Sequence, residues 1–246
     1  MPPGRIDIHN HLLPGIDDGC RDVDETLTCI RRLMQVGYRG AICTPHIYPP
    51  EFPDNTAGNI AEWTQQLREV LREAKLDFQV WAGGEMRLYP GSGMMAWIGK
   101  HGMPALGPSR CILVDYWEEE WPESVLADLR WLISHGYRPI LAHPERLPPT
   151  PDIGAQLGKL AAMGVWFQGN FNCLTGLEGA LAGYLVRQFL HAGLYQFLAL
   201  DIHRPDTLES RLDGVALAEA EVGAEVVEQL AGTGPGELVE GEETNG

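Results

Sequence analysis

Apolar and polar residues alternate along this chain with two different periods. Short apolar runs, typical of buried strands, are followed by longer segments in which apolar residues recur every three or four positions, as in amphipathic helices. We predict strands near residues 6–9, 40–44, 77–82, 111–115, 138–142, 165–169 and 196–200. We predict helices over residues 22–36, 59–74, 122–134, 152–163, 177–190 and 211–230. The chain is therefore expected to consist of repeated strand–helix units.

Strand–helix alternation predicts a parallel sheet with right-handed crossovers. Glycines at the expected helix C-termini, Gly37, Gly136, Gly164 and Gly193, support these boundaries. An open doubly wound sheet would place ligands mainly at one switch point, whereas a barrel brings the carboxyl end of every strand to one mouth. Because candidate ligands follow five separate strand-like runs, we predict a closed or nearly closed α/β barrel. The 246 residues, 44% of them hydrophobic, suffice for one such domain.

Histidines and carboxylates occupy the ends of these apolar runs. His9 and His11 are two residues apart, so they face one side of a strand, where buried imidazoles repel when charged unless a cation organises them. Asp201 and His203 repeat this spacing after a very apolar run. Imidazole and carboxylate together suit Mn, Fe or Zn, and they predict an open hydrolytic metal site. The candidate ligands are His9, His11, Asp18, His46, Glu85, Asp115, His143, Asp201 and His203.

Several candidates also have a structural interpretation. On spacing alone a turn before the next helix accounts better for Asp18, and only its approach to the barrel mouth favours a ligand; His46 could be a loop residue beside Pro45. Asp115 ends a buried run, so either a cation or a buried arginine must compensate its charge. Arg146 could bind a phosphoryl oxygen with its planar guanidinium or form a surface salt bridge.

The charge of the chain restricts its partners. The formal net charge is −16, and nine acidic residues but no Lys or Arg follow Arg211. This sign opposes binding to a nucleic-acid backbone, so a phosphate substrate would need bound cations and a few arginines. We expect one domain over residues 1–231 and a disordered, acidic, glycine-rich tail over residues 232–246.

Five cysteines, an odd number without a Cys-x-x-Cys pair, argue against a disulfide framework. None of them is followed by five residues and an arginine, which excludes a cysteine-dependent phosphatase loop. We find neither a signal peptide nor a run long enough to span a membrane, and we expect a cytoplasmic protein without direct membrane insertion. The sequence gives no indication of the oligomeric state.

Together these motifs resemble the polymerase-and-histidinol-phosphatase (PHP) superfamily. In order and spacing they are most similar to the bacterial metal-dependent protein-tyrosine phosphatases of capsule and exopolysaccharide synthesis. The similarity runs from about residue 5 to about residue 211. It is carried by Ile6-Asp7-Ile8-His9-Asn10-His11, Asp17-Asp18-Gly19, Thr44-Pro45-His46, Gly84-Glu85, Ala142-His143-Pro144-Glu145-Arg146 and Asp201-Ile202-His203.

The resemblance implies a distorted seven-stranded (β/α)7 TIM-like barrel with three divalent metal ions, commonly Mn²⁺, with Fe or Zn as alternatives. By motif match, the first ion is held by His9, His11, Glu85 and Asp201, the second by Glu85, Asp115 and His143, and the third by Asp18, His46 and His203. The resemblance further implies attack on phosphorus by a metal-activated hydroxide, with Arg146 and a second arginine, Arg204 or Arg211, as the catalytic cations.

The function implied is a protein-tyrosine phosphatase acting on a bacterial tyrosine kinase of polysaccharide synthesis. Two alternatives remain: a phosphatase for histidinol phosphate or another small molecule, and a non-catalytic metal-binding regulatory module. The chain departs from the family pattern at Asp115, where a glutamate is usual, and at Leu200, where a small residue is usual. An aromatic substrate could be accepted by the loop residues Tyr48, Phe52, Tyr89, Trp117 and Trp121, for which loop packing is the other interpretation.

Overall fold

The computed structural model describes residues 4–240. Its strands are β1 (Arg5–Asp7), β2 (Tyr38–Cys43), β3 (His46–Ile47), β4 (Gln79–Ala82), β5 (Glu85–Arg87), β6 (Cys111–Asp115), β7 (Arg138–Ala142), β8 (Trp166–Asn170) and β9 (Phe197–Ala199). Its α-helices are α1 (Val23–Gln35), α2 (Ala57–Glu73), α3 (Met94–His101), α4 (Glu123–Ser134), α5 (Ile153–Met163), α6 (Ala180–His191), α7 (Pro205–Val222), α8 (Ala224–Glu228) and α9 (Gly234–Glu240). Short 3₁₀ turns at Pro144–Arg146 and Phe171–Thr175 and a π-helical turn at Gln229–Thr233 complete the regular structure.

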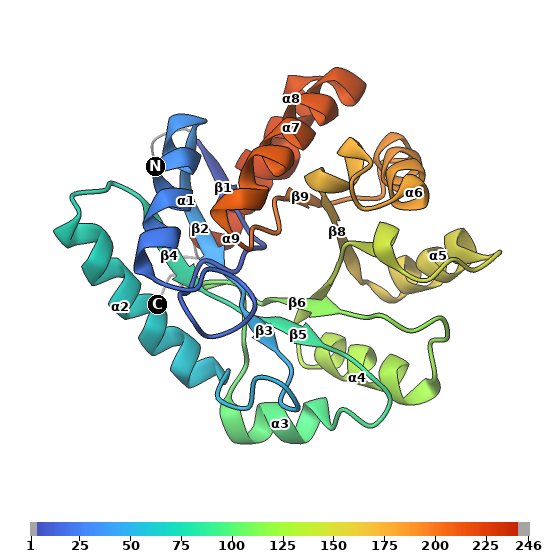
Figure 1. Cartoon of the computed structure of the whole chain (residues 1–246). Helices are drawn as coiled ribbons and strands as arrows, with labels where there is room; N and C mark the ends of the chain where they lie inside the picture. Colours follow the sequence, from blue (N-terminus) through green and yellow to red (C-terminus); the bar gives the residue numbers. More distant parts are fainter. Residues whose placement is uncertain (1–3, 241–246) are drawn as a thin grey trace.

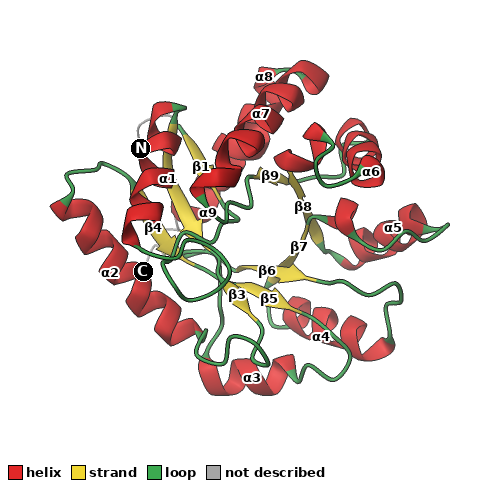
Figure 2. Ribbon diagram, viewed as in Figure 1, coloured by secondary structure: helices red, strands yellow, loops and turns green. Residues whose placement is uncertain are grey.

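All strand pairs are parallel, as predicted. One sheet has the order β1-β2-β4 and the other the order β3-β5-β6-β7-β8-β9. The segments that follow β1 and β9 also lie side by side, because Asn10 forms a parallel bridge with Ile202 and the Asp201 amide donates to the His9 carbonyl at 2.8 Å. Figures 1 and 2 show the helices outside the strands. The protein is a mixed α/β fold whose helices cover the outer faces of parallel strands.

The predicted number of seven strands is wrong, because two short strands that were not predicted, β3 and β5, follow the second and third predicted strands after a brief interruption. Pro45 has no N–H for a ladder, and the Thr44 amide donates instead to the Asn10 carbonyl at 3.0 Å. At Gly84 an added Cβ would lie 2.4 Å from Ile47 Cδ1, so the chain can pass here only without a side chain. Each interruption carries the chain from one sheet to the other.

The predicted helices are present within about three residues at most ends, except at the C-terminus. There the expected helix over residues 211–230 begins at Pro205 and is broken at Gly223, whose φ is +90°. The helix α3 was not predicted.

The expected disorder of residues 232–246 is wrong for residues 232–240. This segment is helical, and Leu238 and Val239 are buried in the same apolar cluster as Ile6 and Ile8 of the first strand segment. The prediction of disorder relied on the glycine-rich, acidic composition and overlooked these two apolar side chains, which anchor the segment in the core. Residues 241–246 lie outside the described residues.

The apolar core ends where the polar site begins. Leu113 and Ala199 belong to one buried cluster, and two residues further along the same strand segments stand Asp115 and Asp201. Because side chains two apart face the same side of a strand, Asp115 at the end of β6 continues a row of apolar side chains, whereas Asp201 lies just beyond the end of β9. All five cysteines are buried and free. Between residues 4 and 240, no helix combines the length and the apolar character needed to cross a membrane.

Candidate metal centre

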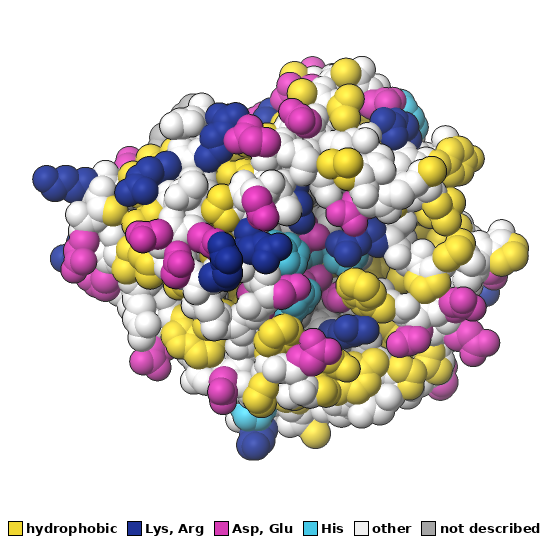
Figure 3. Space-filling model, in the orientation of Figure 1, with side chains coloured by type: hydrophobic (Ala, Val, Ile, Leu, Met, Phe, Trp, Pro, Cys, Tyr) yellow, Lys and Arg dark blue, Asp and Glu magenta, His cyan; other side chains and the backbone are white. Residues whose placement is uncertain are grey.

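The nine candidate ligands converge at the carboxyl ends of the strands. Figure 3 shows histidines and carboxylates gathered in a hollow near the middle of one face, with arginines around it. Within the described chain, three groups have ligand atoms that all lie within 4.8 Å of one another. They are His9, Glu85 and His143; His9, His11 and Asp201; and His11, Asp18, His46 and His203.

The inner part of the cluster is buried and centred on Glu85. His9 Nε2 and His143 Nε2 each lie 3.2 Å from Glu85 Oε1, and His46 Nδ1 lies 2.8 Å from Glu85 Oε2. On the other side, His9 Nε2 and His11 Nε2 each lie 3.4 Å from Asp201 Oδ1. A carboxylate in this central position can bridge two cations.

The outer part of the cluster faces solvent. Asp18 Oδ1 lies 3.4 Å from His46 Nε2 and 3.6 Å from His203 Nε2. The turn interpretation of Asp18 is therefore insufficient, because its carboxylate points at two histidines from distant segments. His11 belongs to this group as well as to the inner one, which differs from the grouping implied by the resemblance.

Asp115 is placed at the edge of the inner group. Its Oδ1 lies 3.9 Å from His143 Nε2, and its Oδ2 accepts a hydrogen bond from the Trp117 indole. Burial and the nearby charge of Glu85 raise the pKa of the Asp115 carboxyl. No arginine pairs with Asp115 among residues 4–240, and its neighbours there are His143 and the Trp117 indole, so a bound cation would compensate its charge.

Four buried atoms of the cluster make no hydrogen bond within the described residues: His9 Nε2, His11 Nε2, Glu85 Oε2 and Asp115 Oδ1. Buried polar atoms are nearly always paired, since an unpaired one costs free energy. Burial lowers the pKa of His9, but the charges of Glu85 and Asp201 outweigh it and raise this pKa to about 9. A cluster of imidazoles and carboxylates of this kind is a donor set that fits divalent Mn, Fe or Zn.

Two residues that the sequence did not single out orient these histidines. Asp17 Oδ2 lies 2.7 Å from His11 Nδ1 and accepts from the His46 amide at 3.0 Å. Gln168 Oε1 lies 2.7 Å from His9 Nδ1. A histidine whose Nδ1 is engaged in this way directs Nε2 at the metal position. In this loop the sequence predicted Asp18 as the ligand, but the preceding residue, Asp17, orients the His11 imidazole.

Two ligand positions have strained backbone. His143 has a φ of +31° and Asp201 a φ of +52°, in the left-handed region that residues other than glycine rarely adopt. Such conformations cost about 1–3 kcal/mol each and persist only where the surroundings enforce them. Here the His143 amide donates to the Gln168 carbonyl at 2.7 Å, and the Asp201 carbonyl accepts from Arg211 Nε at 2.7 Å.

The three candidate arginines have different surroundings. Arg146 Nη1 donates to Asp201 Oδ2 at 3.1 Å, and its guanidinium carbon lies 5.4 Å from the centre of the Trp117 ring. Arg211 is buried and donates to backbone carbonyls, so it supports the Asp201 turn. Arg204 lies 3.6 Å from Asp206, with 44% of its side chain exposed. Of the three, Arg146 combines a contact with a candidate ligand and partial exposure.

Three of the five candidate aromatic residues border the metal cluster. Tyr48, Phe52 and Trp117 line a cavity of about 180 Å³ together with Asp18, Glu51, His46, Asp115 and Arg87. Tyr89 instead packs edge-on against Tyr48, and Trp121 packs against Tyr116. Arg87 was not a candidate from the sequence.

Comparison with known proteins agrees with this geometry. A family model described as capsular polysaccharide synthesis, CpsB/CapC, matches residues 5–240. The chain belongs to the CpsB/CapC family. The resemblance to the bacterial phosphatases of capsule synthesis is thereby confirmed.

Relatives within and around the CpsB/CapC family are similar over most of their length. The chain is 28% identical to tyrosine-protein phosphatase YwqE of Bacillus subtilis over 225 residues, 90% of this chain and 86% of the relative. It is 25% identical to tyrosine-protein phosphatase CpsB of Streptococcus pneumoniae over 220 residues, 86% of this chain and 89% of the relative.

Solved structures share the fold of this chain. A crystal structure from a study of YwqE and CpsB, described there as unique metal-dependent tyrosine phosphatases, matches with a TM-score of 0.82 and 27% identity over 96% of this chain and 94% of that one. An organophosphorus hydrolase mutant from Deinococcus radiodurans shares the fold with a TM-score of 0.55 and 15% identity, over 96% of this chain and 93% of that one.

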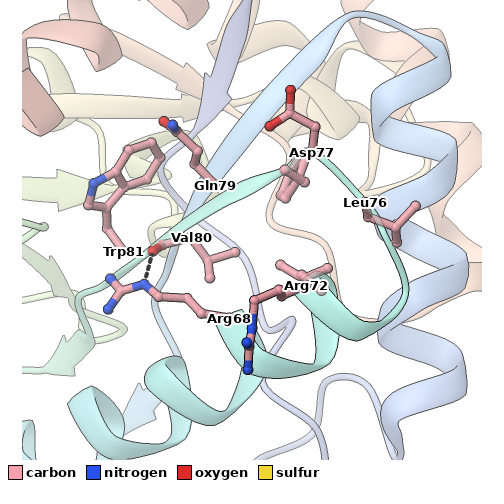
Figure 4. Close-up of a pocket in the computed structure, with 9 residues that line it drawn as sticks. Arg68, Arg72, Leu76, Asp77, Gln79, Val80 and Trp81 are labelled. Carbon is pink, nitrogen blue, oxygen red and sulfur yellow. Dashed lines mark hydrogen bonds between the residues drawn. The ribbon is translucent and has the colours of Figure 1, made fainter.

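A second hollow in this CpsB/CapC family member lies away from the metal cluster, between α2 and β4. Figure 4 shows Arg68 and Arg72 of α2 beside Asp77, Gln79 and Trp81. Arg68 Nε donates to the Val80 carbonyl at 2.9 Å. None of the nine candidate ligands lines this hollow.

Replacing Asp17 with asparagine is expected to weaken Mn²⁺ binding by about 10- to 100-fold. Asparagine has a single carbonyl oxygen, so it can accept at the position of Oδ1, from the Gly19 amide, or at the position of Oδ2, from the His46 amide, and it loses the charge that holds His11 Nδ1. The measurement is titration of metal-free protein with Mn²⁺, with Asp22→Asn, at the N-cap of α1, as the control. An unchanged dissociation constant in Asp17→Asn would show that Asp17 does not position His11.

Proposed function

We propose that this chain is a metal-dependent protein-tyrosine phosphatase that dephosphorylates a bacterial tyrosine kinase of capsule or exopolysaccharide synthesis in the cytoplasm. The observation that carries this proposal is the convergence of eight histidines and carboxylates in three groups, with Asp115 at their edge and four buried atoms that make no hydrogen bond within the described residues. The identity with relatives named tyrosine-protein phosphatases supports the substrate class.

We propose three divalent ions, preferentially Mn²⁺, bound by the nine candidate ligands. The inner positions use Glu85 with His9, His143 and the neighbouring Asp115, and His9 with His11 and Asp201; the outer position uses Asp18, His46 and His203. When bound, the ions supply Lewis acidity towards phosphoryl oxygens and an activated water. The bridge between Asn10 and Ile202 supports the further proposal that the strands form a distorted barrel around this site.

The residues of the chain position the substrate around these ions. Arg146, fixed by Asp201, directs its remaining N–H donors towards the hollow and binds a phosphoryl oxygen. Glu178 Oε2, 3.9 Å from Arg146 Nε, restrains the guanidinium on its other edge. Because the inner ligands are buried while Asp18 and His203 are partly exposed, the substrate has to enter from the side of Asp18 and His203.

The open side of the site suits an aryl phosphate. Tyr48, Phe52 and Trp117 line the cavity beside His46, and the Phe52 ring stacks on the His46 imidazole with centroids 5.9 Å apart. An aromatic ring that leaves the metal cluster along this path would exchange water for aromatic contacts. This arrangement favours a phosphotyrosyl substrate over an aliphatic phosphomonoester.

The experiment that tests the function is steady-state phosphate release by metal-free protein reconstituted with Mn²⁺. A phosphotyrosyl peptide and histidinol phosphate are compared at equal concentration, and protein without added metal serves as the control. We expect Mn²⁺-dependent turnover with a large preference for the peptide. Preference for histidinol phosphate would identify a small-molecule phosphatase instead. A lack of activity on both substrates would support a non-catalytic, regulatory metal-binding module.

A further inference from the structure

Arg87 has the position of a substrate-binding residue. It ends β5 two residues after Glu85, so the two side chains leave the strand on the same face. In the register of β5 and β6, Arg87 is the direct partner of Asp115. At about 3.3 Å per residue, Arg87 stands roughly 7 Å beyond the centre of the cluster towards the mouth.

The guanidinium of Arg87 is fixed but keeps its donors free. Its central carbon lies 4.8 Å from the centre of the Tyr48 ring and 5.2 Å from that of Trp117. Between residues 4 and 240, no hydrogen bond or ion pair of Arg87 is found, even though the side chain is half-buried and Asp115 is adjacent in the sheet. Cation–π contacts restrain the group without using its N–H donors, which leaves a pre-ordered fork for an oxyanion.

The surroundings of Arg87 point to the metal cluster. The guanidinium shares its cavity with Asp18, His46 and Asp115, which are all candidate ligands. The same Trp117 ring also lies against Arg146. One indole therefore orders two arginines at the edge of one site.

The expected second arginine after His203 has no equally suitable geometry. Arg211 is occupied by backbone carbonyls, and Arg204 lies beside Asp206. We propose that Arg87 is the second arginine that binds the phosphoryl group of the substrate, together with Arg146. This inference rests on the proposed phosphatase function. The same donors of Arg87 could instead bind the carboxylate of an acidic residue next to the phosphotyrosine. The test therefore has to separate binding of the phosphoryl group from binding of a substrate carboxylate.

The test compares Arg87→Met and Arg87→Lys with wild-type protein, all loaded with Mn²⁺. The substrates are p-nitrophenyl phosphate and two phosphotyrosyl peptides, one with acidic and one with neutral flanking residues. Inhibition by inorganic phosphate and metal content are measured on the same samples. Arg72→Met, which removes an exposed arginine of α2, is the charge control, and Arg204→Met represents the competing assignment.

We expect Arg87→Met to lower kcat/KM by the same factor on all three substrates, roughly 10- to 100-fold, as for a lost charge-assisted hydrogen bond. The inhibition constant of inorganic phosphate should rise by a similar factor at unchanged metal content. The kcat/KM of Arg87→Lys should lie between those of wild-type protein and Arg87→Met, because lysine keeps the charge but not the planar fork of donors. Since lysine preserves most of the packing, it also tests the inference if methionine prevents folding.

Four results would overturn the inference: a loss confined to the acidic peptide, an unchanged inhibition constant for phosphate, a loss of bound metal, or a larger effect of Arg204→Met. Failure of the proposed function is distinguishable from these, because the wild-type protein would then be inactive on both phosphotyrosyl peptides. In that case calorimetric titration of the Mn²⁺-loaded variants with inorganic phosphate still decides whether Arg87 binds the anion.

Discussion

Replacing His9 and His11 together with alanine is expected to remove bound metal and phosphatase activity at the same time. The two rings are fully buried, and their Nε2 atoms face Glu85 and Asp201 at 3.2 to 3.7 Å. His11 belongs to the outer group as well as to an inner one, and His9 to both inner groups. The double change therefore removes a ligand from every group, and we expect a loss of at least about 10³-fold in kcat/KM.

The measurement is metal content by mass spectrometry beside Mn²⁺-dependent phosphate release. His135→Ala is the matched control, because His135 lies at the end of α4 and contacts the Trp131 carbonyl at 2.8 Å, outside all three ligand groups. The control should retain metal and turnover. Turnover by the double variant after dialysis against a chelator would contradict the metal hypothesis.

The positions of the candidate ligands could be predicted because each follows a strand-like run or stands in a short motif beside one. His9, His143 and Asp201 come at or just after the ends of apolar strand segments, and parallel strands bring such ends together. The strained backbone of His143 and Asp201 could not be predicted in this way. It depends on hydrogen bonds to Gln168 and Arg211, which belong to other elements.

Adjacent residues of the same type limit what the sequence can assign. Asp17 and Asp18 are both carboxylates in one turn, yet Asp17 orients His11 and Asp18 faces His46. The difference arises from the path of the loop at Gly19, where an added Cβ would lie 2.2 Å from the His11 carbonyl oxygen. Only the close packing of the folded loop separates the two roles.

Contacts between distant segments explain the remaining differences. The helix α9 is held by burial of Leu238 and Val239 near Ile6, at the other end of the chain. Similarly, Arg87 is ordered by Tyr48 and Trp117 from two different loops. The local pattern of apolar and polar residues does not predict either contact, because each contact joins segments that are far apart in the sequence.

Replacing Arg146 with methionine should leave the metal bound while lowering turnover. Arg146 Nη1 touches Asp201 on Oδ2, whereas His9 and His11 approach Oδ1, so the ligand atom keeps its histidine neighbours. Asp201 Oδ2 also retains the hydrogen bond from Asn170 Nδ2 at 2.8 Å. A donor aimed at charge that develops in the transition state contributes about 10²- to 10³-fold to kcat, and we expect a loss of this size.

The Arg146→Met result is measured as kcat at saturating Mn²⁺ together with metal content, and Arg72→Met is the control. That variant removes an arginine of α2 that forms an exposed ion pair with Glu69, outside all three ligand groups, so turnover should stay within about threefold of wild type, as for the loss of an exposed ion pair. Metal loss in Arg146→Met would assign the arginine to support of Asp201 rather than to the substrate. Full metal with normal turnover would instead exclude it from the phosphoryl site and leave Arg87 as the only arginine proposed there.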